Sequence, residues 1–265
     1  MQKSAEVLEN ALLKGNISQE KFDSIVKKHS CIQDSSDAIC LLLQASGFPI
    51  EKDDNDDSYY LSTLSQNIKD AVFCIVDLET SGGKPDNSQI IEIGAVKIQN
   101  GEIIDSFESL VYCGYVPKYV TMITGIETAA LANAPHLKTV LQKFKEFLSG
   151  SIFVAHNVDF DYKFLSNSFK RCGLGEIANR KVCTIDLARK TIESQKYGLQ
   201  HLNEELGLEN ESHHRALSDA RATAKLFMIV LEKLPPEIVT VEDLIAFSKR
   251  NQKKLKKKKK EKTSQ

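Results

Sequence analysis

The stretch Val72-Phe73-Cys74-Ile75-Val76-Asp77-Leu78-Glu79-Thr80 joins an apolar run to two carboxylates that are two residues apart. A short apolar run of this length predicts a buried strand. Residues i and i+2 of a strand point to the same face, so Asp77 and Glu79 would project together. Two neighbouring anions repel each other, and a hard divalent cation relieves that repulsion. The stretch therefore predicts a strand that carries part of a metal site.

Two further segments hold side chains that would complete such a site. One is Ala155-His156-Asn157-Val158-Asp159-Phe160-Asp161, and the other is His214, followed five places later by Asp219. Carboxylates and a histidine gathered from separated elements are what two-metal phosphodiester hydrolysis requires. Together the segments indicate one metal-binding cluster.

The chain around these segments alternates between strand and helix patterns. Residues 89–99 and 102–112 are β-rich runs joined by Asn100-Gly101, a strong hairpin signal, and with the strand at 72–78 they predict a three-stranded antiparallel start. Further patterns predict helices over 135–148, from Phe160 to near Gly173, over 198–206 and over 217–234, with strands at 151–155 and 182–185. This order predicts an α/β layered domain with a mixed sheet flanked by helices.

The order and spacing of the motifs resemble the DEDDh branch of the DnaQ-like 3′→5′ exonucleases, the family of the proofreading epsilon subunit of bacterial DNA polymerase III. The matching segments are Asp77–Gly82, Ile90–Val96, Ile123–Ile126 with Ala134-Pro135, His156–Asp161 and His214–Ala220. The sister branch has a tyrosine four residues before the last aspartate, where this chain has Arg215. The resemblance extends from about Val72 to Leu234 and implies a ribonuclease-H-like exonuclease fold.

The resemblance also implies an activity. We expect metal-dependent 3′→5′ hydrolysis of DNA that releases nucleoside 5′-monophosphates from single-stranded 3′ ends or mismatched termini, in proofreading or DNA processing with a replicative DNA polymerase. An RNA-trimming 3′→5′ exoribonuclease is the alternative within the class, because the catalytic residues do not distinguish the sugars. A non-catalytic nucleic-acid-binding module with the same fold is the alternative outside it.

Resemblance and chemistry together assign a role to each catalytic residue. Two Mg²⁺ or Mn²⁺ ions would be held by four carboxylates, with Asp77 bridging both ions. Glu79 and Asp219 would complete the site of the attacking water, and Asp161 would hold the second ion near the leaving oxygen. His214 would be the general base, because an imidazole titrates near neutrality.

Several neighbouring residues compete for these roles. His214 and Asp219 would be about 140° apart around a helix, so we expect His214 to precede the helix. His213 differs from His214 only by register, and the five-residue motif spacing favours His214. Asp159 competes with Asp161 but fits a helix cap. The remaining candidates are read as structural or left open: His156 and Asn157 as loop-orienting residues, and Glu92 as a buried charge of unresolved role.

Composition suits an intracellular enzyme. The chain has 265 residues, enough for one substantial domain and a smaller one. Its six cysteines are scattered without a Cys-x-x-Cys pair, which argues against a zinc cluster or a disulfide framework. There is no charged-then-apolar leader and no long uncharged apolar stretch, so we expect a cytoplasmic protein without a membrane partner.

Charge divides the chain into three parts, which we expect to be a small N-terminal domain over 1–65, a nuclease domain over 72–234, and a C-terminal helix with a disordered basic tail over 235–265. Residues 1–70 and 71–248 each carry a net charge of −5, and residues 249–265 carry +9. Three short helices, two of them capped by Ser18 or Ser36, and a hairpin resemble a winged helix-turn-helix. The hairpin turn contains Asp53, Asp54, Asp56 and Asp57, which would repel phosphate, so we expect protein docking and not DNA binding there. The polar stretch 62–71 predicts little contact between this domain and the nuclease.

Overall fold

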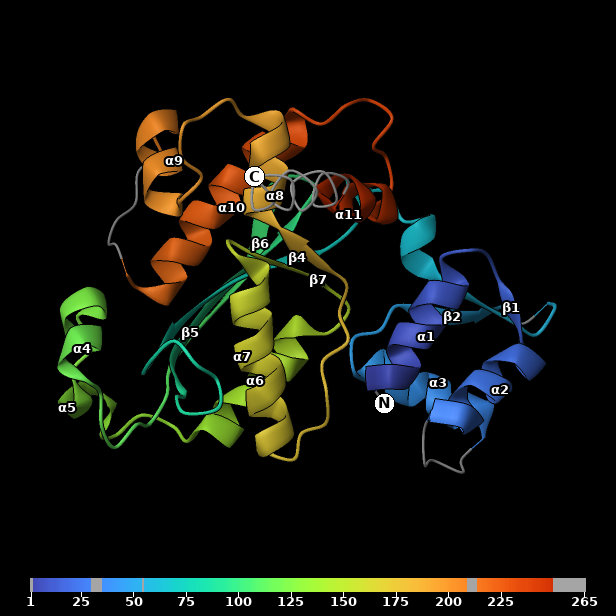
Figure 1. Cartoon of the computed structure of the whole chain (residues 1–265), viewed down its shortest axis with the longest axis horizontal. Helices are drawn as coiled ribbons and strands as arrows, with labels where there is room; N and C mark the ends of the chain where they lie inside the picture. The colour runs from blue at the N-terminus through green and yellow to red at the C-terminus, as the bar shows by residue number, and fades with distance from the viewer. Residues whose placement is uncertain (1, 30–34, 54, 209–213, 250–265) are drawn as a thin grey trace, which may run out of the picture.

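The computed structural model describes residues 2–29, 35–53, 55–208 and 214–249. His213 and the predicted basic tail beyond residue 249 lie outside these ranges. Two β-sheets are present in the described part of the chain, one of three strands near the N-terminus and one of five strands in the centre (Figure 1).

The central sheet has the strand order β6-β5-β4-β7-β8. Its strands are β4 (Phe73–Thr80), β5 (Ile90–Gln99), β6 (Glu102–Leu110), β7 (Ile152–Ala155) and β8 (Lys181–Cys183). The first three strands pair antiparallel, whereas β7 runs parallel to both β4 and β8. The predicted α/β class with a mixed sheet flanked by helices is confirmed.

The hairpin between β5 and β6 turns at the predicted dipeptide. Asn100 has φ 51° and Gly101 has φ 77°. Both residues therefore have the positive φ that a two-residue turn of type I′ requires, and asparagine and glycine adopt that left-handed conformation most easily. The local sequence was sufficient to place this turn.

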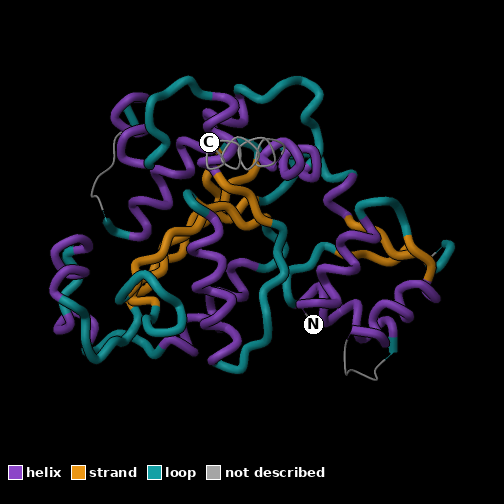
Figure 2. Tube along the Cα trace, in the orientation of Figure 1, coloured by secondary structure: helices purple, strands orange, loops and turns teal. Residues whose placement is uncertain are grey.

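Helices cover both faces of the central sheet, as Figure 2 shows. One face packs against α6 (Leu137–Leu148) and α7 (Val158–Arg171). The other packs against α8 (Thr184–Thr191), α9 (Leu199–Leu206), α10 (Ala216–Glu232) and α11 (Val241–Lys249). Two short helices, α4 (Lys118–Thr124) and α5 (Thr128–Leu131), belong to a smaller apolar cluster with Ile91 of β5.

The alternation of side chains along β4 decides which way its carboxylates point. Cys74 and Val76 pack in the core with α6 and α7, whereas Phe73 and Ile75 pack in the core with α10. Because side chains alternate along a strand, Asp77 and Glu79 continue the row of Phe73 and Ile75. Both carboxylates therefore lie on the face that α10 covers.

The predicted strand that begins at Val182 gives way to a helix earlier than expected. The strand expected over 182–185 stops at Cys183, and Thr184 and Ile185 begin α8. Asp186 lies in the first turn of that helix. The apolar run Val182-Cys183-Thr184-Ile185 suits either structure, so periodicity alone could not separate strand from helix.

The N-terminal residues form a unit with its own core. Its elements are α1 (Gln2–Leu12), β1 (Ile17–Ser18), α2 (Gln19–His29), α3 (Ser36–Ala45), β2 (Ile50–Asp53) and β3 (Ser58–Leu61), with the strand order β1-β3-β2. Phe22 stacks on Tyr59 at its centre, with ring centroids 4.1 Å apart. The cap of α3 is Ser35, which accepts the Ala38 N–H at 3.3 Å, and not the predicted Ser36. The winged-helix assignment stays a prediction.

The polar stretch predicted little contact between this unit and the rest of the chain, but buried polar contacts do join them. Buried Arg180, which precedes β8, pairs with Glu9 of α1 at 2.5 Å and donates to both carboxylate oxygens of Glu242 on α11 at 2.7 and 2.6 Å. The Ala178 N–H donates to the Ser46 carbonyl at 2.6 Å. Within the supposed connector, Thr63 is buried and donates to Glu242 at 2.6 Å. Thr63 is thus a polar residue of the stretch 62–71 that bonds to a buried partner, and the composition of the stretch could not reveal this contact.

No helix in the described ranges is both long and apolar enough to cross a membrane.

Candidate active site

Three elements bring the predicted carboxylates to the same end of the neighbouring strands β4 and β7. Asp77 and Glu79 lie near the end of β4, and Asp161 lies in the first turn of α7, directly after β7. Asp219 lies in the first turn of α10, which packs on β4 and β5. Asp161 and Asp219 are both buried. The ends of neighbouring strands and the starts of two helices thus meet where the carboxylates lie.

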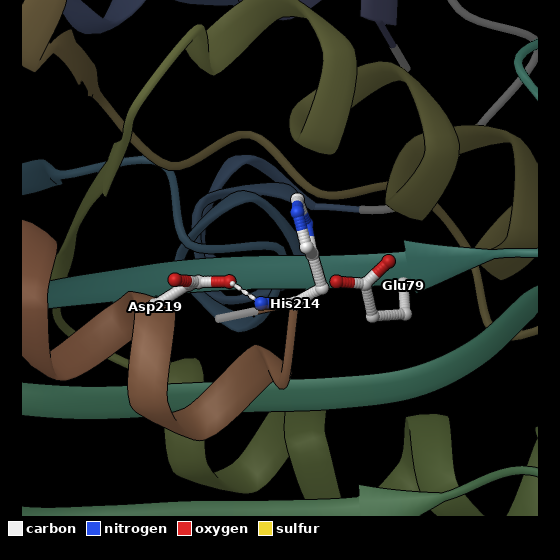
Figure 3. Close-up of side chains that lie close together, drawn as sticks. All are labelled: Glu79, His214 and Asp219. Atoms are coloured by element: carbon white, nitrogen blue, oxygen red, sulfur yellow. Dashed lines mark hydrogen bonds between the residues drawn. The ribbon is translucent and has the colours of Figure 1, made fainter. Parts of the chain in front are cut away.

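Glu79, His214 and Asp219 form a group that could hold a metal ion. Each offers one ligand atom, and these atoms all lie within 4.8 Å of one another. In Figure 3 His214 lies between Glu79 and Asp219. Its backbone N–H donates to Asp219 Oδ2 at 3.0 Å, and its side chain is exposed. His214 precedes α10 with φ 60°, so it does lie off the helix as predicted.

Mutual repulsion marks the carboxylates as a cluster. Burial raises the pKa of Asp77 well above its usual range, and the charges of Asp161, Asp219, Glu79 and Glu92 raise it further. These neighbours are the other predicted acids together with Glu92, and like charges nearby disfavour the ionised form of Asp77, as expected for a residue that lies among them.

Asp161 and Glu79 show the same pattern. Burial raises the pKa of Asp161, although hydrogen bonds from its own N–H and that of Leu78 oppose the rise. Burial raises the pKa of Glu79 to about 7, assisted by Asp219 and Glu92 and opposed by Arg215. Several buried carboxylates that destabilise one another are suited to a hard divalent cation, whose charge would remove the repulsion. The oxygen-rich donor set fits Mg²⁺ or Mn²⁺ better than a thiolate-seeking metal.

The competing residues have structural partners. Asp159 is exposed and pairs with Lys181 at 2.7 Å. It lies in the first turn of α7, whose N-cap position belongs to Asn157 with φ 79°, so Asp159 is not the expected cap.

His156 connects three segments. Its Nδ1 lies 2.8 Å from Thr184 Oγ1, and its Nε2 lies 2.9 Å from the Tyr197 carbonyl oxygen. Burial lowers the pKa of His156 to about 4. A neutral imidazole with both nitrogens engaged orients the loops around β7, as the sequence indicated, and leaves no nitrogen for a metal.

Glu92 has a partner that the sequence did not reveal. Its carboxylate is fully buried on β5, opposite Glu79 in the strand register, and it accepts from Arg215 at 2.7 Å and from the Ala216 N–H at 3.0 Å. The only signal in the sequence was a charge within Ile90-Ile91-Glu92-Ile93, which suggested burial but named no partner. Arg215 is 123 residues away along the chain.

Comparisons with known proteins place the chain in a family. The exonuclease family model of the RNase T type matches residues 74–227. The DNA polymerase III subunit epsilon of Aquifex aeolicus is 37% identical over 173 residues, which cover 64% of this chain and 86% of that protein. The PolC-type DNA polymerase III of Caldanaerobacter subterraneus subsp. tengcongensis is 41% identical over 164 residues, but this chain spans only 12% of its length.

Solved structures show the same architecture. Exonuclease X in complex with 5′-overhanging duplex DNA is 26% identical, with a TM-score of 0.55, covering 66% of this chain and 99% of that one. Exonuclease I of E. coli in complex with a dT13 oligonucleotide is 18% identical, with a TM-score of 0.56, covering 62% of this chain and 41% of that one. The second likeness concerns the fold alone. The family match begins at residue 74, so the N-terminal unit lies outside it.

Proposed function

We propose that this chain, which belongs to the exonuclease family, hydrolyses DNA from the 3′ end and releases nucleoside 5′-monophosphates with the help of two divalent metal ions. The family match confirms the ribonuclease-H-like exonuclease fold and the 3′→5′ exonuclease class that the motifs predicted. The DNA substrate, the two-metal chemistry and the roles of individual residues are the proposal.

One observation carries the proposal. Five residues from three separated motifs converge. The ligand atoms of Glu79, His214 and Asp219 lie within 4.8 Å of one another, and the charge of Asp161 adds to burial in raising the pKa of Asp77. A binding module that used only the fold would have no need to maintain so many repelling carboxylates in one place. Function is argued from the site, since the fold alone supports many activities.

Each residue then has a task in the reaction. The carboxylates of Asp77, Glu79, Asp161 and Asp219 would hold the two ions, which stabilise the attacking and leaving oxygens of an in-line displacement when bound. The imidazole of His214 would accept the proton of the attacking water. The water oxygen bonds to phosphorus as the bond to the 3′ oxygen breaks. The leaving 3′ oxygen takes a proton from solvent and becomes the new 3′ end of the strand.

The position of His214 suits a base. Its side chain is exposed, so water and a phosphodiester can reach it, while its backbone N–H is tied to Asp219. The imidazole can therefore act beside the metal ligands without being one of the four carboxylates. This arrangement supports His214 as the base, and the proposal does not require His214 to bind a metal ion.

We also propose that the enzyme works in the cytoplasm with a replicative DNA polymerase on mismatched or single-stranded 3′ ends. The relative in Aquifex aeolicus is named a subunit of DNA polymerase III, and the PolC-type relatives are themselves named DNA polymerase III. A nuclease that removes 3′-terminal nucleotides complements a polymerase that adds them.

A labelled-substrate assay tests the proposal. Single-stranded DNA, matched duplex, mismatched duplex and RNA, each labelled at the 5′ or the 3′ end, are incubated with Mg²⁺, Mn²⁺ or chelator. We expect a ladder shortening from the 3′ end of DNA, fastest on single strands and mismatches, with none in chelator. Shortening in excess chelator would contradict the metal chemistry, and faster degradation of RNA than of DNA would contradict the substrate.

A further inference from the structure

Glu92 is a buried charge whose two oxygens are both engaged at the start of α10. Oε1 accepts from Arg215 Nη2 at 2.7 Å and from Arg215 Nε at 3.1 Å. Oε2 accepts from the Ala216 N–H at 3.0 Å. A fully buried carboxylate is stable only when it is paired and hydrogen-bonded. Moving Arg215 or Ala216 would therefore leave the buried Glu92 carboxylate without a partner, at a cost in free energy.

The two contacts of Glu92 hold different things. The Ala216 N–H belongs to the first residue of α10, so this bond fixes the start of the helix that carries Asp219. Arg215 directly follows His214, so its fork-like contact fixes the turn in which His214 lies. In that turn His214 has φ 60°, a backbone conformation that residues other than glycine adopt only at a cost in energy.

We propose that the Glu92–Arg215 ion pair is a positioning device that holds the His214 imidazole beside the metal-binding carboxylates. The inference rests on the proposed function and adds two positioning residues to it. Arg215 is planar and forms two bonds, so it restrains direction as well as distance. The pair joins β5 to the turn, and β5 is paired with β4, which carries Asp77 and Glu79. Base and metal ligands thereby share one rigid support.

A double-mutant cycle separates positioning from general support of the fold. Arg215→Met removes the ion pair but leaves the Glu92 bond to the Ala216 N–H, so Asp219 should stay in place. We expect kcat to fall by about tenfold or more in the presence of His214, and by less than about twofold in the His214→Ala background. KM and the Mg²⁺ concentration for half-maximal rate should change less than about threefold in either background.

Two further variants sharpen the test. Arg215→Lys keeps the charge and one bond, so it should recover part of the lost kcat. Glu108→Gln is the matched control, because half-exposed Glu108 lies 3.8 Å from the same Arg215 Nη2 and its replacement leaves the 2.7 Å bond to Glu92 intact; its kcat should equal that of the wild type. If Arg215→Met does not fold, as judged by urea unfolding, the cycle is run with Arg215→Lys.

The outcomes are distinct. An equal fall in kcat with and without His214 would overturn the inference, as would full activity in Arg215→Met. A wild-type enzyme that releases no nucleotides from 3′ ends would instead overturn the proposed function. A loss confined to thermal stability, with kcat unchanged in the folded fraction, would assign the pair to the fold alone.

Discussion

Asp77 on β4 is paired across the sheet with Gly94 on β5, and this glycine lets α10 approach the strand that carries the metal ligands. A Cβ on Gly94 would lie 2.1 Å from the backbone carbon of Ala216 and 2.1 Å from the backbone nitrogen of Leu217. Backbone atoms of a helix can relieve such a contact only if the helix itself moves. The absence of a side chain at residue 94 therefore sets how close Asp219 comes to Asp77.

Gly94→Ala should displace α10 from β5. We expect the free energy of unfolding to fall by about 1–3 kcal/mol, the usual effect of overpacking, and the activity to fall by more than the unfolded fraction explains. Urea unfolding and nucleotide release measure the two effects. Gly114→Ala is the control, because its Cβ would meet only the Tyr112 hydroxyl at 3.9 Å. Wild-type activity in Gly94→Ala would show that helix and strand need no close approach.

Asp77→Asn should abolish nucleotide release and keep the fold. Burial and the neighbouring carboxylates both raise the pKa of Asp77, so replacing its buried carboxyl with a neutral amide should leave stability in chelator unchanged or higher. The gain in melting temperature that Mg²⁺ gives the wild type should largely disappear, because that gain reports binding to the folded state. Differential scanning calorimetry with and without Mg²⁺ measures it. Exposed Asp105→Asn should behave as the wild type does.

His214→Ala should lower the rate by about 10²–10⁴-fold, the usual contribution of a positioned base. Metal binding should be largely kept, because the four carboxylates remain. Single-turnover rates and Mg²⁺-dependent thermal shifts separate the two properties. His213→Ala should have a much smaller effect, and the opposite order would place the base at His213.

The raised pKa of Glu79 predicts two opposite dependences on pH. In chelator, the folded protein holds a proton on Glu79 up to a pKa of about 7, whereas an unfolded glutamate loses it near pH 4.3, so stability should fall as pH rises between these values. Metal ligands must be deprotonated, so the apparent affinity for Mg²⁺ should rise with pH and level off above about 7. Urea unfolding and calorimetric titration from pH 5 to about 8 follow both. Glu79→Gln should weaken both trends, while exposed Glu102→Gln should not.

Arg180→Met should destabilise the whole chain. It leaves Glu242 as a buried charge without its guanidinium partner and removes the link to Glu9, a loss of about 3–5 kcal/mol by analogy with other buried pairs. Lys181→Met breaks the exposed pair with Asp159 and should change stability by less than about 1 kcal/mol. Urea unfolding measures the free energy of unfolding of both variants and of the wild type.

The same contacts predict the outcome of truncation. A chain that starts at Ser65 would lose Glu9, Ser46 and Thr63, all of which bond to residues of the remaining part. We expect lower stability than in the full chain, contrary to the independence that the polar connector suggested. A fragment as stable as the full chain would restore that first interpretation.

The elements that the sequence predicted well are those with a local cause. Asn100-Gly101 forms a turn because both residues tolerate positive φ, and β4 forms because its apolar run is buried on both faces of a sheet. Alternation along that run was enough to place Asp77 and Glu79 on one face. The spacing of His214 from Asp219 was enough to place the histidine outside the helix.

The sequence could not predict relationships between residues that are far apart in the chain. Nothing local indicates that Arg215 neutralises Glu92, that Arg180 joins Glu9 to Glu242, or that Gly94 makes room for Ala216. Each depends on which buried surfaces meet, and that is decided by packing over the whole sheet.

By itself, then, the sequence determined the main strands and the long helices of the central domain, the family and the residues proposed for catalysis, because strand alternation, turn chemistry and motif spacing are local properties of the chain. Tertiary structure decided the assembly of those residues into one site and the attachment of the N-terminal unit. The physical reason is that buried charges are tolerated only beside partners, and their partners here come from distant segments.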